Sequence, residues 1–369
     1  MPKQKRERNK ILLTGGHAGT TAVAVIDELQ GAVDIFWIGA TSAFEGKKVE
    51  TIEEMVFQKS EVKSFKIPTG KINHKYPYKS ILSLFKLPFG FVAALYLLIV
   101  IRPKVILSFG GSVSIPVVFA AWVCRKTIVL HEQTIAAGKA NIEMSRFANK
   151  VTISRQESAK YFPIDKTLLT GNPVQKSIRQ LKPKTKLSQN PNILVVGGSR
   201  GASVINDVVI ESITDILKMF NLHHITGRVD YLKLINARQK LPKNLADKYH
   251  VYPVVNPKSM YKMYDLSDLI ISRSGANIVS EILIAKRPTI FIPIPWTYND
   301  EQNKNAKFVE KLGSAIVLDQ DGLTGRDLVM ALQMVVKKWD SMVANAIKYE
   351  SPDRDAAQKL ASIVLEYLK

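Results

Sequence analysis

The segment KILLTGGHAGTTAVAVIDEL, residues 10–29, decides the fold. It holds an apolar run, the turn Gly15-Gly16-His17, and then a stretch in which apolar residues recur at helical spacing. A buried parallel strand reads as a continuous apolar run, and glycines permit a tight turn into a helix. The segment therefore predicts a strand, a glycine turn and a helix. His17 needs a separate reason, because a turn that is only tight does not require an imidazole.

The same pattern recurs along the chain. Apolar runs that predict strands are VDIFWIG, KVILSFGG, TIVLHEQ and KVTIS, with helical segments such as residues 22–29 and 139–148 between them. Residues 168–192 are polar, basic and punctuated by proline, and we interpret them as a linker. The pattern then restarts with NILVVGGSRGAS. Strands that alternate with helices predict two doubly wound α/β domains with a cleft between them.

The two ends of the chain carry their own signals. Residues 1–9 are basic, and only a short apolar run follows them, so we expect a disordered tail rather than a signal peptide. Near the other end, Ser351 is a plausible N-cap and Pro352 would take the first helical position. The single cysteine, Cys124, excludes an internal disulfide and fits a reducing compartment.

The chain is strongly basic, with 52 Lys and Arg against 32 Asp and Glu and a net charge of +20. Such a charge attracts nucleic acid, anionic lipid or phosphorylated substrates. The same net charge is also found in proteins whose lysine-rich surface is simply solvated and binds no polyanion. No aromatic pattern, zinc-ligand spacing or other nucleic-acid module accompanies it, so we expect no nucleic-acid partner.

Residues 80–104 form a strongly apolar segment with basic residues around it. The uninterrupted run at residues 87–101 is shorter than the roughly 20 residues that a membrane span requires. Two interpretations fit: a buried helix, or an apolar patch with a basic rim that lies in a membrane interface.

Two further turns offer a place for phosphate and sugar. The loop after NILVV contains Ser199, Arg200 and Gly201, and it predicts either a diphosphate cradle at a helix N-terminus or an ordinary strand–helix turn. The segment SRSGANIVSE repeats this pattern, and Glu281 lies about two helical turns beyond its turn. A carboxylate there can accept both hydroxyls of a ribose, although it fits a solvated helix residue as well.

Amide side chains form another candidate group. Gln302 and Asn305 lie three residues apart at the start of a predicted helix, and amides both donate and accept hydrogen bonds, as sugar hydroxyls require. Polar residues at the start of a surface helix give the same pattern. Gly110-Gly111 and the LHEQ segment also follow predicted strands, so polar residues and glycines gather at strand ends, where open α/β sheets bind ligands. No metal site is expected.

The motifs TGGH, FGGSVSIP, LHEQ, GNPV, VVGGSRGA, SRSGANIVSE and DEQNKNA occur in this order over residues 10–361. Together they resemble the MurG family of peptidoglycan N-acetylglucosaminyltransferases. The resemblance implies a GT-B fold, in which two Rossmann-like domains flank a cleft and a C-terminal helix crosses back to the first domain. The implied domains are an acceptor and membrane-associating domain over 10–170 plus 350–369, and a UDP-GlcNAc-binding domain over 171–349.

The resemblance also implies an activity. It is the inverting transfer of GlcNAc from UDP-GlcNAc to undecaprenyl-diphospho-MurNAc-pentapeptide, lipid I, to give lipid II. No metal or other cofactor is implied. The enzyme would be peripheral at the cytoplasmic face of the cell membrane, on an anionic surface, with residues 85–101 as its membrane patch.

Site roles follow from the same resemblance. His17 is the expected catalytic base, although its place also fits a residue that only caps or orders the turn, and Gly15, Gly16, Gly110 and Gly111 are expected at the acceptor. Expected at the donor are Thr134, Gln175, Ser199, Arg200, Gly201, Glu281, Gln302 and Asn305.

The chain departs from the family pattern at several of these motifs. Thr134 replaces an asparagine, Gln175 an arginine and Ser112 a tyrosine, while Arg200 stands for a glutamine and Glu301 for a histidine. These changes leave two alternatives open, a GT-B transferase for another lipid acceptor and a non-catalytic nucleotide-sugar-binding homologue.

Overall fold

The computed structural model describes residues 8–16, 18–41, 57, 61–70, 86–197 and 202–369. The chain divides into two compact units. Unit 1 comprises Met1–Gln175 and Pro352–Lys369, and unit 2 comprises Lys176–Ser351. Each unit is built on its own sheet, so each is described by itself.

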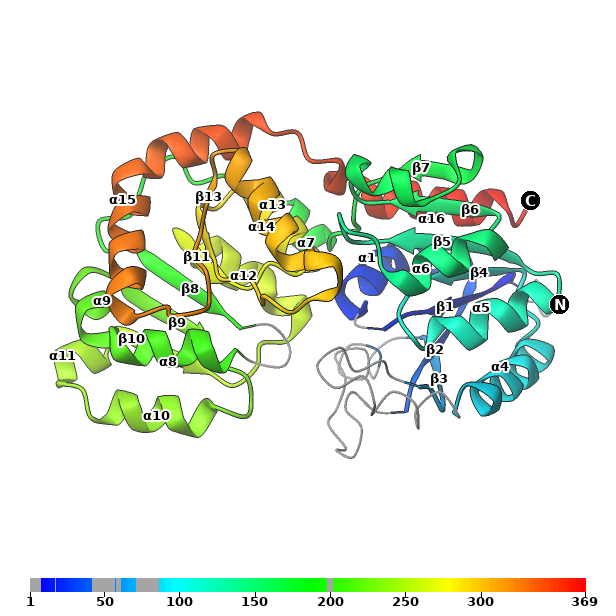
Figure 1. The fold of residues 1–369 in the computed structure, drawn as a ribbon, viewed down its shortest axis with the longest axis horizontal. Coiled ribbons are helices and arrows are strands. Elements are labelled where there is room, and N and C mark those ends of the chain that lie inside the picture. The colour runs from blue at the N-terminus through cyan, green and yellow to red at the C-terminus, as the bar shows by residue number, and fades with distance from the viewer. Residues whose placement is uncertain (1–7, 17, 42–56, 58–60, 71–85, 198–201) are drawn as a thin grey trace, which may run out of the picture. The chain divides into compact units, whose positions relative to one another are not determined.

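Unit 1 holds a parallel sheet of seven described strands in the order β3-β2-β1-β4-β5-β6-β7 (Figure 1). The strands are β1 (Lys10–Thr14), β2 (Asp34–Ala40), β3 (Lys63–Ile67), β4 (Val105–Ser108), β5 (Thr127–Glu132), β6 (Lys150–Ile153) and β7 (Thr167–Leu169). The helices of the described part are α1 (Gly19–Leu29), α4 (Leu87–Ile101), α5 (Ser114–Val123), α6 (Lys139–Met144) and α16 (Ala356–Glu366), with short 3-10 turns at Ser145–Phe147, Gln156–Tyr161, Ile164–Lys166 and Pro352–Arg354.

The apolar run of β1 covers both faces of this sheet. Ile11 and Leu13 point to one face, where they join a core that includes residues of α1 and α16. Leu12 points to the other face, into a core with residues of α4, α5 and α6. Successive side chains of a strand alternate between faces, so a strand covered on both sides must be apolar at every position.

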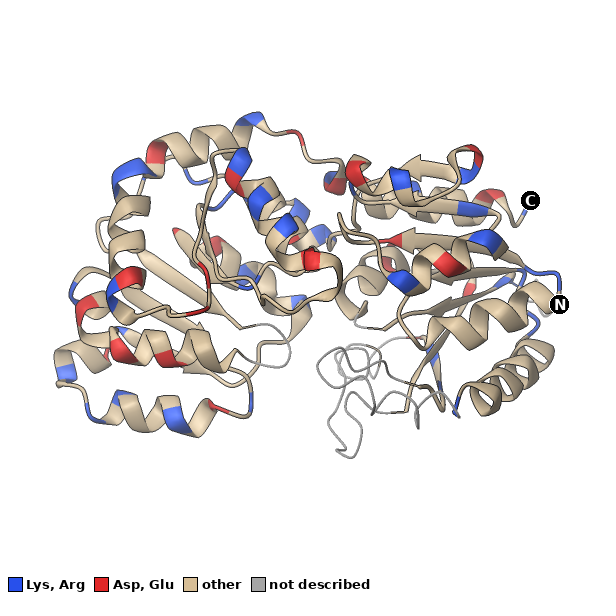
Figure 2. Ribbon diagram, viewed as in Figure 1, with Lys and Arg blue, Asp and Glu red and all other residues tan. Residues whose placement is uncertain are grey.

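Helix α4 is apolar but only partly covered. Gly90, Ala94 and Leu98 are buried at helical spacing, whereas Phe89 is 71% exposed and Tyr96 65% exposed. On α5, Trp122 remains 49% exposed. Figure 2 shows that neither helix carries a charged residue. The segment is therefore a helix with one buried edge and one exposed apolar face, and among the described helices none has both the length and the apolarity to span a membrane.

Two expectations about the chain ends of unit 1 are wrong in detail. The proposed linker does not begin at residue 168, because Thr167–Leu169 form β7 and residues 170–175 are buried. The C-terminal helix begins at Ala356, and Pro352 instead opens a separate 3-10 turn. The two segments are bonded to each other, since Asp353 in that turn is fully buried and accepts a hydrogen bond from the backbone N–H of Asn172.

Unit 2 repeats the design with a parallel sheet of six described strands, ordered β10-β9-β8-β11-β12-β13. The strands are β8 (Asn192–Val196), β9 (Asn221–Ile225), β10 (Tyr249–Tyr252), β11 (Leu269–Ser272), β12 (Thr289–Phe291) and β13 (Ala315–Val317). The helices are α7 (Lys176–Arg179), α8 (Ser203–Glu211), α9 (Ile213–Met219), α10 (Tyr231–Gln239), α11 (Lys243–Ala246), α12 (Met260–Leu266), α13 (Ala276–Ala285), α14 (Glu301–Lys311) and α15 (Gly325–Lys348), with 3-10 turns at Pro257–Ser259 and Tyr298–Asp300.

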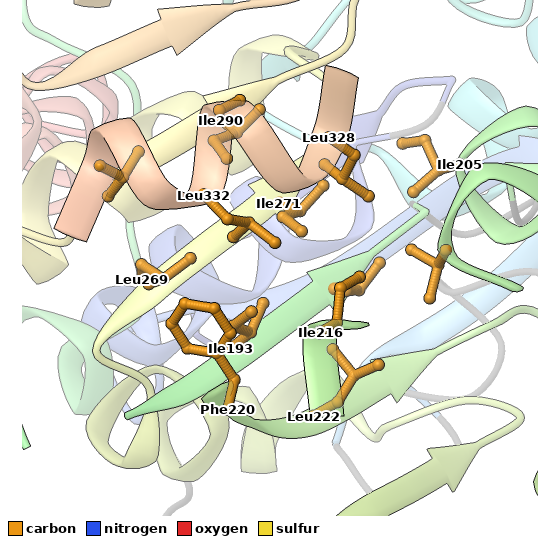
Figure 3. Close-up of a cluster of buried hydrophobic side chains, with 14 of the residues drawn as sticks. Ile193, Ile205, Ile216, Phe220, Leu222, Leu269, Ile271, Ile290, Leu328 and Leu332 are labelled. Atoms are coloured by element: carbon orange, nitrogen blue, oxygen red, sulfur yellow. The ribbon is translucent and has the colours of Figure 1, made fainter. Parts of the chain in front are cut away.

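One core of unit 2 lies between its sheet and the long helix α15. Ile193, Leu269 and Ile271 on the sheet pack with Leu328 and Leu332 of α15 (Figure 3). The helix begins at a capping box, in which the Thr324 hydroxyl accepts from the backbone N–H of Asp327 and the Asp327 carboxylate accepts from Thr324. Packing of α15 on the sheet removes the apolar faces of both from water, and this burial is the main contribution to the stability of the layer.

Candidate active site

Both sheets place glycine turns at the point where the strand order reverses. In unit 1 the central neighbours are β1 and β4, and in unit 2 they are β8 and β11. Helix connections diverge from this point in a doubly wound sheet, and the crevice at the strand carboxyl ends is where such folds bind ligands. All four of these strands end in a turn that contains glycine, so the topology marks one candidate subsite in each unit.

In unit 1 the two glycine turns lie against each other. The backbone N–H of Gly16 donates to the carbonyl of Gly110 at 2.9 Å, and a Cβ on Gly111 would come within 3.1 Å of the Cα of Gly16. Gly110 and Gly111 have φ values of 81° and 85°. The structure thus brings Gly15, Gly16, Gly110 and Gly111 together, and an added Cβ would crowd its neighbours at Gly15, Gly110 and Gly111 but not at Gly16. His17 lies outside the described residues.

Glu132 organises the loop beside these turns. Its Oε1 accepts from the backbone N–H of Thr134 at 2.8 Å, and its Oε2 accepts from the backbone N–H of Gly138 at 2.9 Å and from Nδ2 of Asn141 at 2.8 Å. Asn141 is buried and lies directly over Gly110, where an added Cβ would meet its Oδ1 at 2.2 Å. The LHEQ segment is therefore a scaffold that fixes the backbone of Thr134, a predicted donor residue.

His131 is not suited to proton transfer near neutral pH. It is fully buried, with Nδ1 2.9 Å from the Thr152 hydroxyl and Nε2 3.3 Å from Oδ1 of Asn172. Burial lowers the pKa of His131 to about 4, so the ring is neutral and serves as a structural link between β5 and β6. Gln175, another predicted donor residue, is also buried and is the last residue of the first stretch of unit 1.

In unit 2 two helices begin at the carboxyl ends of the central strands, and no described side chain caps either of them. Helix α8 follows Ala202, and α13 follows Gly275, and neither residue carries a side-chain acceptor. The first N–H groups of a helix require acceptors, and an anion supplies them when no side chain does. Ser199, Arg200 and Gly201, predicted in the loop before α8, lie outside the described residues.

Three of the residues at this end of unit 2 hold one another. The Ser274 hydroxyl donates to the carbonyl of Gln302 at 2.7 Å, and Nδ2 of Asn305 donates to the carbonyl of Ser274 at 3.0 Å. Oε1 of Gln302 accepts from the backbone N–H of Ile294 at 3.0 Å. Gln302 is half-buried and can offer its Nε2 group to a sugar hydroxyl, whereas the buried Asn305 supports the turn.

Glu281 lies on α13 and is 8% exposed. The hydroxyl of Tyr264, on the neighbouring helix α12, donates to its Oε2 at 2.7 Å. Burial raises the pKa of Glu281 to about 7, and the hydrogen bond from Tyr264 opposes that rise. The carboxylate is therefore held by a neutral donor in a largely dry position, as a binding group for hydroxyls would be.

The comparisons with known proteins identify the family. Residues 11–153 match the glycosyltransferase family 28 N-terminal domain, and residues 192–360 match the glycosyltransferase family 28 C-terminal domain. A UDP-N-acetylglucosamine--N-acetylmuramyl-(pentapeptide) pyrophosphoryl-undecaprenol N-acetylglucosamine transferase of Treponema denticola is 32% identical over 83% of this chain and 81% of its own length. The chain belongs to glycosyltransferase family 28, in the group of the MurG transferases.

Other family 28 members match along nearly the whole chain. The transferase of the same name from Clostridium botulinum is 29% identical, covering 98% of this chain and 99% of its own. A solved structure of Acinetobacter baumannii MurG has a TM-score of 0.71 at 23% identity and covers 97% of this chain and 99% of its own. The predicted GT-B fold, with a Rossmann-like sheet in each half and a C-terminal helix that returns to the first, is confirmed.

Sequence reasoning missed two residues that build this candidate site. Arg273 is buried at the end of β11 and donates to the carbonyls of Ile292 and Pro293, which ties β11 to β12. Tyr264 holds Glu281 from another helix. Arg273 is the second residue of the motif SRSGANIVSE, so its position offered a signal, whereas nothing in the spacing of Tyr264 pointed to Glu281.

Proposed function

We propose that the chain transfers GlcNAc from UDP-GlcNAc to undecaprenyl-diphospho-MurNAc-pentapeptide, converting lipid I to lipid II in peptidoglycan synthesis. The observation that carries this proposal is the match to both family 28 domains, together with relatives named for that activity at 27–32% identity over most of the chain. The glycine turns at both sheet reversals give the activity a place for two diphosphate-bearing substrates.

The proposed reaction is a single displacement with inversion at the anomeric carbon. The acceptor hydroxyl forms the new bond to that carbon while the bond to the β-phosphate breaks and UDP leaves with the electron pair. His17, which follows directly on Gly16, takes the proton of the acceptor hydroxyl, because imidazole titrates near neutral pH. Gly15, Gly16, Gly110 and Gly111, whose turns pack against each other, would form the backbone surface that the acceptor diphosphate meets.

The donor is assigned to unit 2. N–H groups at the start of α8 and α13 stabilise the charge that develops on the leaving diphosphate, without a metal ion. Ser199, Arg200 and Gly201 would face that diphosphate, Glu281 would accept the ribose hydroxyls, and Gln302, supported by Asn305, would donate to the GlcNAc. Thr134 and Gln175 are the two donor residues that unit 1 would contribute.

We place the enzyme on the cytoplasmic face of the membrane as a peripheral protein. The exposed apolar residues of α4 and α5, among them Phe89, Tyr96 and Trp122, would enter the interface. Exposed basic residues adjoin both helices at their ends, including Arg102 and Arg125. Such a rim attracts anionic lipid headgroups.

The test uses purified protein, labelled UDP-GlcNAc and a short-chain lipid I analogue, with product analysis. We expect a lipid-linked disaccharide, an unchanged rate after addition of EDTA, and loss of product in His17→Ala. His250→Ala, which changes an exposed histidine of unit 2, is the matched control and should retain the activity. Undiminished turnover in His17→Ala would exclude the assigned base, and donor binding without transfer would favour a different acceptor or a non-catalytic role.

A further inference from the structure

Tyr264 and Glu281 form a buried pair across two helices of unit 2. Tyr264 lies on α12 and is fully buried, and Glu281 lies on the neighbouring helix α13 (Figure 1). The 2.7 Å bond joins the Tyr264 hydroxyl to Oε2, one of the two carboxylate oxygens. No described residue bonds to the other oxygen, Oε1, which can therefore accept from a second donor.

The backbone carbonyl of Tyr264 accepts a hydrogen bond from the buried Arg287. Nε of Arg287 donates to the carbonyl of Tyr264 at 3.1 Å and to that of Ser267 at 3.0 Å, and its Nη1 donates to the carbonyl of Ala285 at 2.6 Å. Arg287 thereby joins the C-terminal ends of α12 and α13. The hydroxyl of Tyr264 consequently approaches Glu281 from a fixed direction.

A tyrosine hydroxyl is an unusual hydrogen-bond partner for a buried carboxylate that has no basic partner among the described residues. No basic side chain in the described part of the chain forms an ion pair with Glu281, and burial raises the pKa of its carboxyl to about 7. A purely structural carboxylate in such a place is normally paired with a cation or fully hydrogen-bonded. Glu281 therefore has the properties of a group that receives further hydroxyl donors when a ligand binds.

We propose that Tyr264 is a positioning residue of the donor site: its hydroxyl fixes the carboxylate of Glu281 so that Oε1 meets the ribose hydroxyls of UDP-GlcNAc. This inference rests on the proposed function, because it requires Glu281 to bind the ribose. It adds a residue that touches no substrate. Ribose recognition is then set by two helices rather than by one side chain.

The first experiment measures binding of UDP, without acceptor, to wild type, Tyr264→Phe and Glu281→Gln. Tyr249→Phe is the matched control, since the Tyr249 hydroxyl is also buried and bonds to Nδ1 of His224 elsewhere in unit 2. We expect Tyr264→Phe to weaken UDP binding about tenfold, because a carboxylate that is no longer held in place must be ordered when the ribose binds. Tyr264→Phe should weaken binding of the 2′-deoxyribose analogue of UDP by a smaller factor. Tyr249→Phe should leave the affinities for UDP and for this analogue unchanged, and the two Tyr→Phe variants should have equal thermal stability.

The second experiment follows KM for UDP-GlcNAc between about pH 6 and 9. Without the Tyr264 hydroxyl the Glu281 carboxyl ionises at higher pH. As the pH is lowered, KM should therefore begin to rise at a higher pH in Tyr264→Phe than in wild type. We expect kcat to change less than about twofold, because the ribose is remote from the reacting carbon. In Tyr264→Phe/Glu281→Gln, KM should match that of Glu281→Gln alone, since coupled residues are not additive.

The outcomes separate the two proposals. If Glu281→Gln loses discrimination against the deoxyribose ligand while Tyr264→Phe keeps it, the positioning role is wrong and the proposed function stands. If wild type shows no discrimination, Glu281 does not bind ribose and the inference is overturned. If the transfer assay fails but the UDP results hold, the inference is supported and the reaction assigned to the chain is wrong.

Discussion

Arg155 and Asp353 form a bidentate ion pair inside unit 1, with Nη1 and Nη2 donating to Oδ1 and Oδ2 at 2.6 Å and 2.8 Å. The two residues are 198 positions apart in the chain. Asp353 is completely buried and Arg155 is 6% exposed. The pair ties the C-terminal segment to the loop after β6, and the backbone N–H of Asn172 donates to the same carboxylate.

We expect Arg155→Met to destabilise unit 1 by about 3 to 5 kcal/mol, because it leaves the buried Asp353 carboxylate without its cation. Urea unfolding would measure the loss. Lys218→Met, which removes a member of the exposed pair between Lys218 and Asp215, is the control and should change stability little. Equal effects of both variants would contradict this account.

Gly110→Ala should be more destabilising than Gly31→Ala, although both glycines have similar positive φ values of 81° and 85°. A Cβ at Gly31 meets nothing within 4 Å, whereas one at Gly110 meets Oδ1 of Asn141 at 2.2 Å. Gly31→Ala therefore costs only the left-handed backbone, roughly 1 to 2 kcal/mol, and Gly110→Ala adds overpacking of about 1 to 3 kcal/mol. Urea unfolding of both variants tests the difference, and equal midpoints would show that Asn141 moves aside freely.

Gln302→Glu separates the two functions of the Gln302 amide. The variant keeps an oxygen for the N–H of Ile294 but loses the Nε2 donor proposed for GlcNAc. We expect unchanged thermal stability and a KM for UDP-GlcNAc raised about tenfold or more, since an unpaired sugar hydroxyl loses one hydrogen bond. Gln302→Leu, which removes both groups, should lose stability as well. An unaltered KM in Gln302→Glu would remove Gln302 from the donor site.

The free energy of unfolding of unit 1 should decrease as the pH is lowered, because His131 is buried as a neutral ring. Its pKa is lowered to about 4 in the folded state against 6.5 when unfolded, so the unfolded state binds the extra proton. The contribution is fully present above about pH 6.5 and is lost toward pH 4, at about 1.4 kcal/mol per pH unit. Hydrogen exchange in peptides from β5 and β6 would report it. His131→Gln should remove that slope, and an unchanged slope would assign it to other groups.

Vesicle binding should depend on the exposed face of α4. Phe89→Ser should reduce partitioning onto anionic vesicles roughly tenfold or more, because transfer of such a side chain into an apolar environment is worth about 1.5 to 3 kcal/mol. Leu232→Ser is the matched control, since Leu232 is also 71% exposed but lies on α10 of unit 2. Equal binding of both variants would remove α4 from the membrane contact.

The fold followed from local signals more completely than the site did. The apolar runs of β1, β4 and β8 and the glycines after them indicated strand, turn and helix, because burial on both faces of a parallel sheet demands such runs. The segment at 168–175 was misread, because its proline and asparagine indicate a loop in water. It is buried among partners from elsewhere in the chain: the carbonyl of Ile153 accepts from the backbone N–H groups of Thr170 and Gly171, and Asp353 accepts from that of Asn172.

The site was predictable where a motif carries the chemistry and not where a distant residue does. Gly110, Glu281 and Gln302 could be singled out within their own segments. The hydroxyl of Tyr264 on Glu281 and the amide of Asn141 over Gly110 are contacts between separate helices, or between a helix and a turn. Such contacts depend on tertiary packing, which local pattern does not contain.

Cys124, the single cysteine of the sequence, is the C-cap residue of α5 and is half-buried. It lies two residues after Trp122, at the margin of the apolar surface shared by α4 and α5. The native chain thus carries its own attachment point for an environment-sensitive fluorophore, with no competing thiol to remove. The dye's emission would report arrival at a bilayer in real time, from the unmutated enzyme during turnover.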